Sequence, residues 1–219
     1  MNRTDRELAL FYTLFALGAV ATLLLPLEIP SGWRVLGLVL THAVALPAFA
    51  RFRGHTELTS VIRFVWPLSV AMLLPDWVLS AVFGTLHFPD DGAPRIDTMP
   101  VAMAFMWSIP LTLSTWIGRR RNSALAAATS ALVIFLGSEI FAPTLGLWTP
   151  AGDVALVGGV AVYVLFPEWL LGFLTYEAWH QSLDAPWPRR LFDSFVVALS
   201  YLGALGIALL AVERLPGLL

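Results

Sequence analysis

The sequence predicts an all-α, polytopic membrane protein, built as a bundle of seven transmembrane helices. Of its 219 residues, 58% are hydrophobic and only 13% are charged, whereas soluble domains carry about 25% charged residues. The mean hydropathy is +0.77. Long apolar stretches recur along the whole chain. A soluble fold of this size could not bury so much apolar surface, so we expect the excess to face lipid.

Seven stretches have the length and composition of a membrane span. We expect helices, because a segment in lipid must satisfy its own backbone polar groups, and the alternation typical of a membrane barrel is absent. The stretches run from Leu8 to Leu25, Val35 to Ala50, Val61 to Phe83, Val101 to Ile117, Ala124 to Leu145, Val154 to Tyr176 and Phe195 to Val212. No low-complexity linker divides them, so residues 1–219 are expected to form one domain.

The first stretch also has features of a signal peptide. Arg3 and Arg6 precede it, and Ala19-Val20-Ala21 resembles a cleavage site. However, the apolar run continues to Leu25 and is therefore long enough to span a bilayer. We expect an uncleaved first helix.

The arginines predict the orientation of the bundle. All 13 basic residues are arginine. With seven helices, nine of them fall in connections on one side, namely Arg3, Arg6, Arg51, Arg53, Arg119, Arg120, Arg121, Arg189 and Arg190. Only Arg34, Arg95 and Arg214 fall on the other side. Because cytoplasmic loops carry the excess of basic residues, we expect a multi-pass protein of the inner (plasma) membrane with a cytoplasmic N-terminus and an external C-terminus.

Two segments of the chain resemble each other. Residues 76–107 and 139–169 each begin with an acid in a helix, leave that helix through a glycine and an aromatic residue, and end at a tryptophan in a return helix. This predicts an internal repeat. A second pairing, of residues 75–79 with 167–171, would relate helices of opposite orientation, and inverted repeats often flank a site at the midplane. The sequence leaves both pairings open.

Acidic side chains inside apolar stretches are the strongest functional signal. Asp76, Glu139 and Glu168 fall well within predicted spans, as does His42. Such groups are costly in lipid and therefore mark candidate sites. An isolated carboxylate in hydrocarbon tends to take up a proton, and a neutral acid in a dry pocket can donate that proton to a substrate. Alternatively, these acids hydrogen-bond to neighbouring helices and hold the bundle together.

Aromatic residues could line the same pocket, since a ring face stabilises a cation by about 0.5–2 kcal/mol. Trp107, Trp169 and Tyr163 lie within spans, and Trp148 lies nearer the outer face. Tryptophans near the ends of spans can instead anchor the protein at the membrane surface. That second interpretation applies to Trp33, Trp116, Trp148, Trp179 and Trp187.

Several classes of activity are excluded. The chain has no lysine, so it cannot form a retinal Schiff base, and no cysteine, so thiolate chemistry is absent. No nucleotide-binding motif and no basic, aromatic-rich nucleic-acid surface is present. His87, Asp90, Asp91 and Asp97 in the polar outer loop match no metal-ligand spacing, and we expect a solvated turn there. We predict no metal and no cofactor.

The second segment resembles the membrane-embedded lycopene cyclase domain of carotenoid pathways. The residues that carry this resemblance are Glu139, the exit Leu145-Gly146-Leu147-Trp148, and Pro167-Glu168-Trp169. The first segment, with Phe83-Gly84-Thr85-Leu86-His87-Phe88 and the return helix from Pro100 to Trp107, is similar to carotenoid hydratases. The resemblance covers about residues 76–176. It implies chemistry without a cofactor, in which an acid protonates a terminal C=C bond and ring closure or water addition follows.

The sequence therefore predicts an intramembrane isoprenoid or carotenoid enzyme of the cyclase (isomerase) or hydratase type. Glu168 is the expected proton donor and Asp76 and Glu139 its partners, with Trp107, Trp148, Trp169, Tyr163 and His42 as substrate-binding residues. The expected partners are the lipid bilayer and a hydrophobic substrate, and assembly into a homo-oligomer stays open. Two alternatives remain, namely a non-enzymatic protein that binds a lipid or assembles a complex, and a small proton-coupled transporter.

Overall fold

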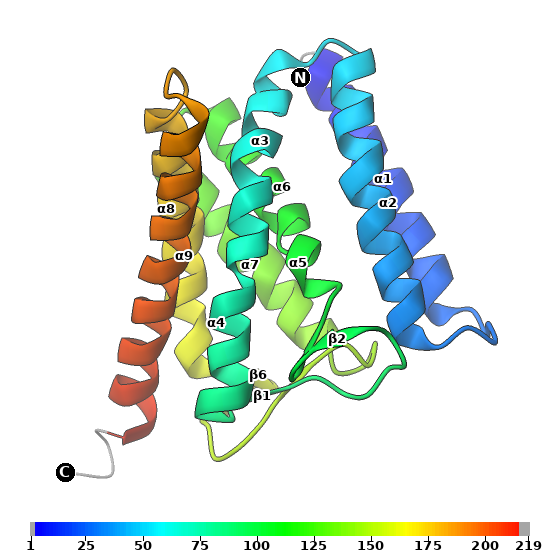
Figure 1. The fold of residues 1–219 in the computed structure, drawn as a ribbon, viewed down its shortest axis with the longest axis vertical. Helices are drawn as coiled ribbons and strands as arrows, with labels where there is room; N and C mark the ends of the chain where they lie inside the picture. The colour runs from blue at the N-terminus through cyan, green and yellow to red at the C-terminus, as the bar shows by residue number, and fades with distance from the viewer. Residues whose placement is uncertain (1–2, 215–219) are drawn as a thin grey trace.

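The computed structural model describes residues 3–214 as an all-α bundle of seven helical rods (Figure 1). The rods are α1 (Arg3–Leu24), α2 (Ser31–Phe52), α3 (Thr56–Ala71) continued by α4 (Leu73–Trp77) and the π-helix η1 (Val78–Phe83), α5 (Met103–Met106) continued by α6 (Ser108–Arg121), α7 (Ala124–Phe141), α8 (Val162–Gln181), and α9 (Trp187–Leu209) continued by η2 (Leu210–Arg214). The start of α1 and the end of α9 lie at opposite ends of the bundle. The side chain of Arg214 lies outside the description.

Five of the seven rods are long and apolar enough to cross a membrane, judged by length and composition alone. These are Arg3–Leu24, Ser31–Phe52, Thr56–Phe83, Ala124–Phe141 and Trp187–Glu213. On α1, Leu10, Leu14 and Leu17 are each more than half exposed, as expected for a helix that faces lipid. The all-α architecture is confirmed and the chain is a multi-pass membrane protein, while the side on which its N-terminus lies stays a prediction.

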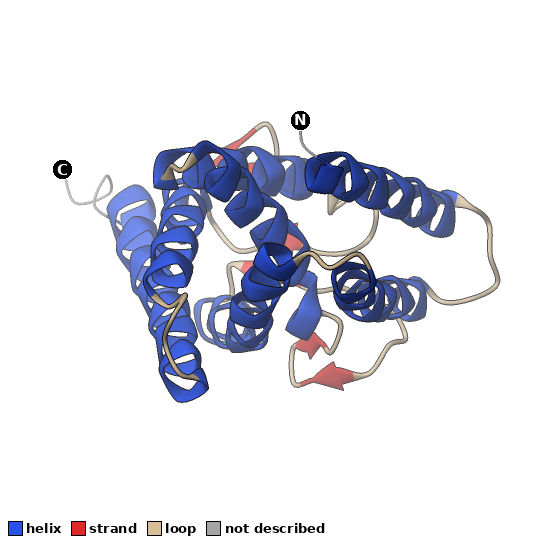
Figure 2. Ribbon diagram, turned by 90° about the horizontal axis from the view of Figure 1, so that it is seen from above, coloured by secondary structure: helices blue, strands red, loops and turns tan. Residues whose placement is uncertain are grey.

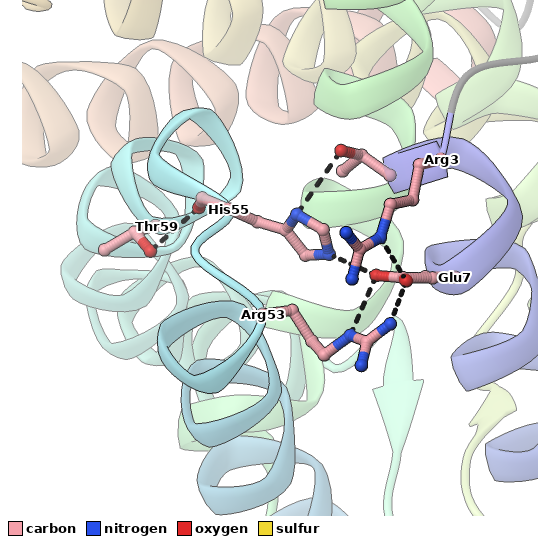
Figure 3. A network of polar contacts seen from close by, with 6 residues as sticks. Arg3, Glu7, Arg53, His55 and Thr59 are labelled. Atoms are coloured by element: carbon pink, nitrogen blue, oxygen red, sulfur yellow. Dashed lines mark hydrogen bonds and ion pairs between the residues drawn. The ribbon is translucent and has the colours of Figure 1, made fainter.

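The arginine-rich ends of the helices lie together at one end of the bundle and are joined by ion pairs. Glu7 of α1 accepts hydrogen bonds from Arg3, from Arg53 after α2, and from His55 Nε2 at 2.9 Å, as Figure 3 shows. Arg120 of α6 pairs with Asp5 of α1 at 3.0 Å. These contacts hold α1 against the start of α3 and the end of α6.

The opposite end is closed by two long connections that are built alike. Each leaves its helix through a glycine in the left-handed region, Gly84 with φ 66° and Gly146 with φ 68°, which is the usual way to end a helix. Strand β1 (Leu86–His87) of the first connection then pairs antiparallel with β4 (Thr149–Pro150) of the second. The two connections therefore form one cover over this end of the bundle.

A short hairpin precedes each return helix. The first is β2 (Arg95–Ile96) with β3 (Met99–Pro100), and the second is β5 (Leu156–Val157) with β6 (Val160–Ala161). Gly158 and Gly159 in the second hairpin have φ of 61° and 86°, as a two-residue turn of this kind requires. Residues 154–161, expected as the start of a span, therefore form a loop and this hairpin, and the sixth helix begins at Val162.

The helices divide into a tight group and a peripheral pair. Small residues of α7, namely Ala127, Ala128 and Ala131, are fully buried, which allows close approach of its neighbours α6 and α8. Seen from above in Figure 2, α1 and α2 lie on the side of the bundle away from α9. Between this pair and the tight group lies the cavity described next.

Candidate active site in the bundle

Asp76 is placed by a break in the third rod. Pro75 lacks an N–H and cannot bond the carbonyl of Ala71, where α3 ends. The following turn widens into η1, and such π segments often occur at functional sites. Asp76 is 2% exposed, and its Oδ2 accepts a hydrogen bond from Trp107 Nε1 at 2.8 Å.

Trp107 reaches Asp76 from an equivalent break in the fourth rod. Pro110 leaves the carbonyl of Met106 without its usual donor, and α5 ends at that residue. The indole also packs against Phe135 and Tyr201, with ring centroids 5.2 and 5.8 Å away. A hydrogen bond and two ring contacts thus hold the Trp107 side chain in one orientation.

Glu139 has a tryptophan partner of its own. It lies near the end of α7, and the chain turns back at Gly146. This turn brings Trp148 Nε1 to 2.9 Å from Glu139 Oε1, so that the indole donates to the carboxyl group. Two acids predicted as site residues therefore each accept an indole N–H.

Glu168 is bonded differently. It follows Pro167 inside α8 and is 2% exposed. Among the residues that the structure describes, its Oε2 has no hydrogen-bond partner. A buried carboxyl oxygen without a hydrogen-bond partner destabilises the fold. Costs of this kind are concentrated at functional sites, so Glu168 is a candidate for contact with a ligand.

All three acids line one cavity of about 460 Å³. Trp107, Trp148 and Tyr163 line it as well, and most of the remaining wall is apolar, with Phe15 from α1 and Val39 from α2 among its residues. Tyr163 Oη donates to Thr85 Oγ1 at 2.9 Å where the cavity meets the cover of connections. Within residues 3–214, no group of three or more His, Asp or Glu side chains is arranged to hold a metal ion.

The cavity reaches the side of the bundle. Phe141 of α7 belongs to its lining and is 63% exposed. Phe141 ends α7, an apolar helix long enough to cross a membrane, so the lining of the cavity extends to the outer surface of this helix.

Two residues expected in the pocket do not line it. Trp169 lies on another face of α8, where it stacks between Phe166 and Phe173 at 6.2 and 6.0 Å. One residue along a helix turns the side chain by about 100°, so Trp169 cannot share the direction of Glu168. His42 is fully buried between α2 and α1, against the rings of Phe11, Tyr12 and Phe15.

Tyr201 and Thr85 are among the lining residues that the sequence did not predict. Tyr201 of α9 is 2% exposed, and Thr85 follows the glycine that ends η1. A tyrosine in the middle of the apolar α9 is a usable signal, because its hydroxyl group needs a partner when it is buried. Thr85 gives no such signal in the sequence. Its position in the cavity lining depends on the pairing of β1 with β4, which brings together residues far apart in the chain.

The hydrogen bond between Trp107 and Asp76 can be tested directly. Trp107→Phe keeps an aromatic ring but leaves Asp76 Oδ2 without its donor, so we expect a loss of about 1–3 kcal/mol of stability, measured by thermal unfolding in detergent micelles. Trp33→Phe is the matched control, because the Trp33 side chain is half-exposed and its indole N–H has no hydrogen bond within the described residues. Equal losses in both variants would mean that the Asp76 bond contributes nothing.

A family model places the chain among relatives without assigning a function. No curated protein and no solved structure matches it. The model of a domain of unknown function, DUF6989, matches residues 73–212. That range begins just before Asp76, ends in η2, and includes all three acids and both connections. Because the match covers more than half of the chain, the protein belongs to the DUF6989 family.

Proposed function

We propose that this protein is an intramembrane enzyme that acts on an unsaturated isoprenoid lipid, such as a linear carotenoid, by proton-initiated chemistry. The observation that carries the proposal is that acids from three separate rods, Asp76, Glu139 and Glu168, line one apolar cavity. Polar side chains in lipid are costly. Helix-to-helix pairing alone would not require three of them to face the same cavity.

The proposed reaction needs one proton donor and one acceptor. A carboxylic acid adds its proton to a C=C bond of the substrate and forms a tertiary carbocation. Loss of a proton from a neighbouring carbon to a carboxylate then gives an isomerised product. If a second C=C bond of the substrate first attacks the cation and closes a ring, loss of a proton beside the new cation gives a cyclised product. Alternatively, a water molecule adds to the cation and releases its proton, which gives a tertiary alcohol. Either route conserves the proton within the site, because one acid loses it and another gains it, and its return from the acceptor to the donor completes the cycle of general acid–base catalysis.

The hydrogen bonds favour particular roles for the three acids. Glu168 is the proposed donor, because the N–H of Trp107 goes to Asp76 and that of Trp148 to Glu139, while Glu168 Oε2 has no donor among the described residues. An indole N–H that is donated to a carboxyl group stabilises its ionised form, and only an ionised carboxylate is free to receive the proton that the cation loses. Asp76 and Glu139 are therefore the proposed acceptors.

The aromatic wall suits a cationic intermediate. Trp107 and Tyr201 lie edge to face at 5.8 Å, and both line the cavity together with Trp148. Ring faces stabilise a cation, by about 2 kcal/mol or more when water is excluded, without a nucleophile that would trap it. We propose that these rings surround the reacting end of the substrate, while the rest of the molecule extends past Phe141 into the bilayer.

One observation favours a non-enzymatic alternative. Asp76 and Glu139 each accept a tryptophan N–H, which is also how acids serve as contacts between parts of a bundle. In that case, the cavity would hold a lipid unchanged. The two functions differ in whether the molecule in the cavity is converted.

Expression in cells that make linear polyenes distinguishes them. We expect the wild-type protein to change the pigment profile, with a product of unchanged mass for cyclisation or a product heavier by one water molecule for hydration, read by mass spectrometry of membrane extracts. Polyene that copurifies with the protein but is never converted would support the binding function. Cells in which the polyene is neither bound nor changed would remove polyenes as the substrate class.

A further inference from the structure

A second cavity lies at the arginine-rich end of the bundle, away from the acids. Its volume is about 550 Å³, and it lies between the end of α2, the start of α3 and the start of α9. We call it the α2–α3 groove. Residues of its lining that matter here are Arg51, Thr59, Ile62, Arg63, Trp66 and Trp187.

The groove contains two arginines whose charge is not compensated. Within residues 3–214, the side chains of Arg51 and Arg63 have no ion pair or hydrogen bond. Neighbouring arginines are paired, since Arg53 bonds to Glu7 and Arg119 to Glu57. Two guanidinium groups that share a cavity and lack an acid partner are suited to a phosphate.

The lining changes from charged to apolar along α3. Thr59, Arg63 and Trp66 are spaced four and three residues apart and therefore lie on one face of that helix. Thr59 is nearest the arginine-rich end, and Trp66 is two turns further toward the middle of the bundle. Trp66 is held edge to face by Phe105, with ring centroids at 5.9 Å. The groove thus has a charged mouth and an apolar, aromatic floor.

This order of residues matches the two parts of a phospholipid. Thr56, the first residue of α3, also lines the mouth, and the start of a helix favours a negative charge. Glu57 in the first turn of α3 is bonded to Arg119 and is not part of the lining. Trp187, half-exposed at the start of α9, is of the type that lies at the headgroup level of a bilayer.

We propose that the α2–α3 groove binds an anionic membrane phospholipid, with Arg51 and Arg63 holding its phosphate and an acyl chain lying against Ile62 and Trp66. This site is separate from the acid-lined cavity and does not depend on what that cavity does. It places the arginine-rich end of α2 and α3 at the depth of the lipid headgroups.

Native mass spectrometry of the full chain, released from vesicles of phosphatidylcholine with or without phosphatidylglycerol, tests the proposal. We expect the wild type to retain one phosphatidylglycerol. Arg51→Gln combined with Arg63→Gln should weaken that retention by roughly tenfold or more, since it removes both charged donors. Arg6→Gln with Arg121→Gln is the matched control, because these arginines lie at the same end but outside the groove, and we expect wild-type retention.

The lysine pair separates lost binding from lost folding. Arg51→Lys with Arg63→Lys keeps both charges and should retain the lipid more strongly than the glutamine pair. Equal loss in the glutamine pair and in the control pair would overturn the proposal, as would equal retention of phosphatidylcholine and phosphatidylglycerol by the wild type. Displacement of the lipid by inorganic phosphate alone would assign the site to a soluble anion instead.

Discussion

Glu168→Gln is expected to abolish turnover in the acid-lined cavity while leaving the bundle folded. Glutamine has nearly the same shape as glutamate but cannot supply the proton that starts the proposed reaction. Loss of a general acid typically lowers the rate by roughly 10²- to 10⁴-fold, so the product should fall below detection in polyene-producing cells. The residue is 2% exposed and lines the cavity, which makes rescue by bulk water ineffective.

The stability of the same variant distinguishes a reacting acid from a structural one. Glu168 Oε2 has no hydrogen-bond partner among the described residues, so the amide group of glutamine loses no bond there. We expect the midpoint of thermal unfolding to stay at or above that of the wild type, as is common when a functional polar group is replaced. A clear drop in the midpoint would instead mean that Glu168 holds helices together.

Glu177→Gln supplies the control on the same helix. Glu177 lies on α8, nine residues beyond Glu168, and does not line the cavity. Its replacement makes the same carboxyl-to-amide change in the same helix but outside the cavity, so both turnover and unfolding should remain at wild-type values. Wild-type turnover in Glu168→Gln would remove that residue as the proton donor and transfer the role to Asp76 or Glu139.

Most of the fold follows from hydrophobicity, because lipid demands long apolar helices. The apolar stretches begin or end within a few residues of the observed helices, as for Ala124, where both the stretch and α7 start. At Val154–Ala161, in contrast, apolar residues expected in a helix form a loop and a hairpin. Leu156 and Val157 are exposed there. The pair Gly158-Gly159 is the one local signal for a hairpin in this stretch, because a two-residue turn favours glycine.

The acids of the site could be predicted from the sequence, but not how they lie relative to one another. Asp76, Glu139 and Glu168 stand out because charge inside an apolar run is rare. Their common cavity depends on which helices are neighbours, which no local pattern specifies. The pairing of β1 with β4, between residues far apart in the chain, is equally invisible to local rules.

The repeat illustrates how a small shift in register changes the interpretation of a site. The sequence comparison pairs Trp107 with Trp169. The observed hairpins give a different register, because Trp107 and Glu168 each lie seven residues after the last strand residue, Pro100 and Ala161 respectively. In this register, the acid of one segment is equivalent to the indole of the other. We propose that the two segments are related in this way, with a hydrogen-bond donor in one and an acid in the other.

The close packing of α7 against α8 leads to the second large effect. Gly172 of α8 lies against Ala131 of α7, and a Cβ atom added at Gly172 would be 2.4 Å from the Cβ of Ala131 and 3.0 Å from the carbonyl oxygen of Ala127. These neighbours are a methyl group and the helix backbone, so neither can turn aside. In membranes, where helices gain little from hydrophobic burial, such contacts between small residues supply much of the association energy.

Gly172→Ala is therefore expected to force α7 and α8 apart and to destabilise the bundle by about 1–3 kcal/mol, measured by thermal unfolding in detergent micelles. Gly172→Leu should prevent assembly of a folded protein. Gly203 of α9 is the matched control, because it is exposed and an added Cβ would meet nothing within 4 Å, so Gly203→Ala and Gly203→Leu should unfold like the wild type. Since Glu139 lies on α7 and Glu168 on α8, any separation of these helices also moves two of the three acids apart. If Gly172→Ala unfolded like Gly203→Ala, the α7–α8 contact would not be what holds the cavity in shape.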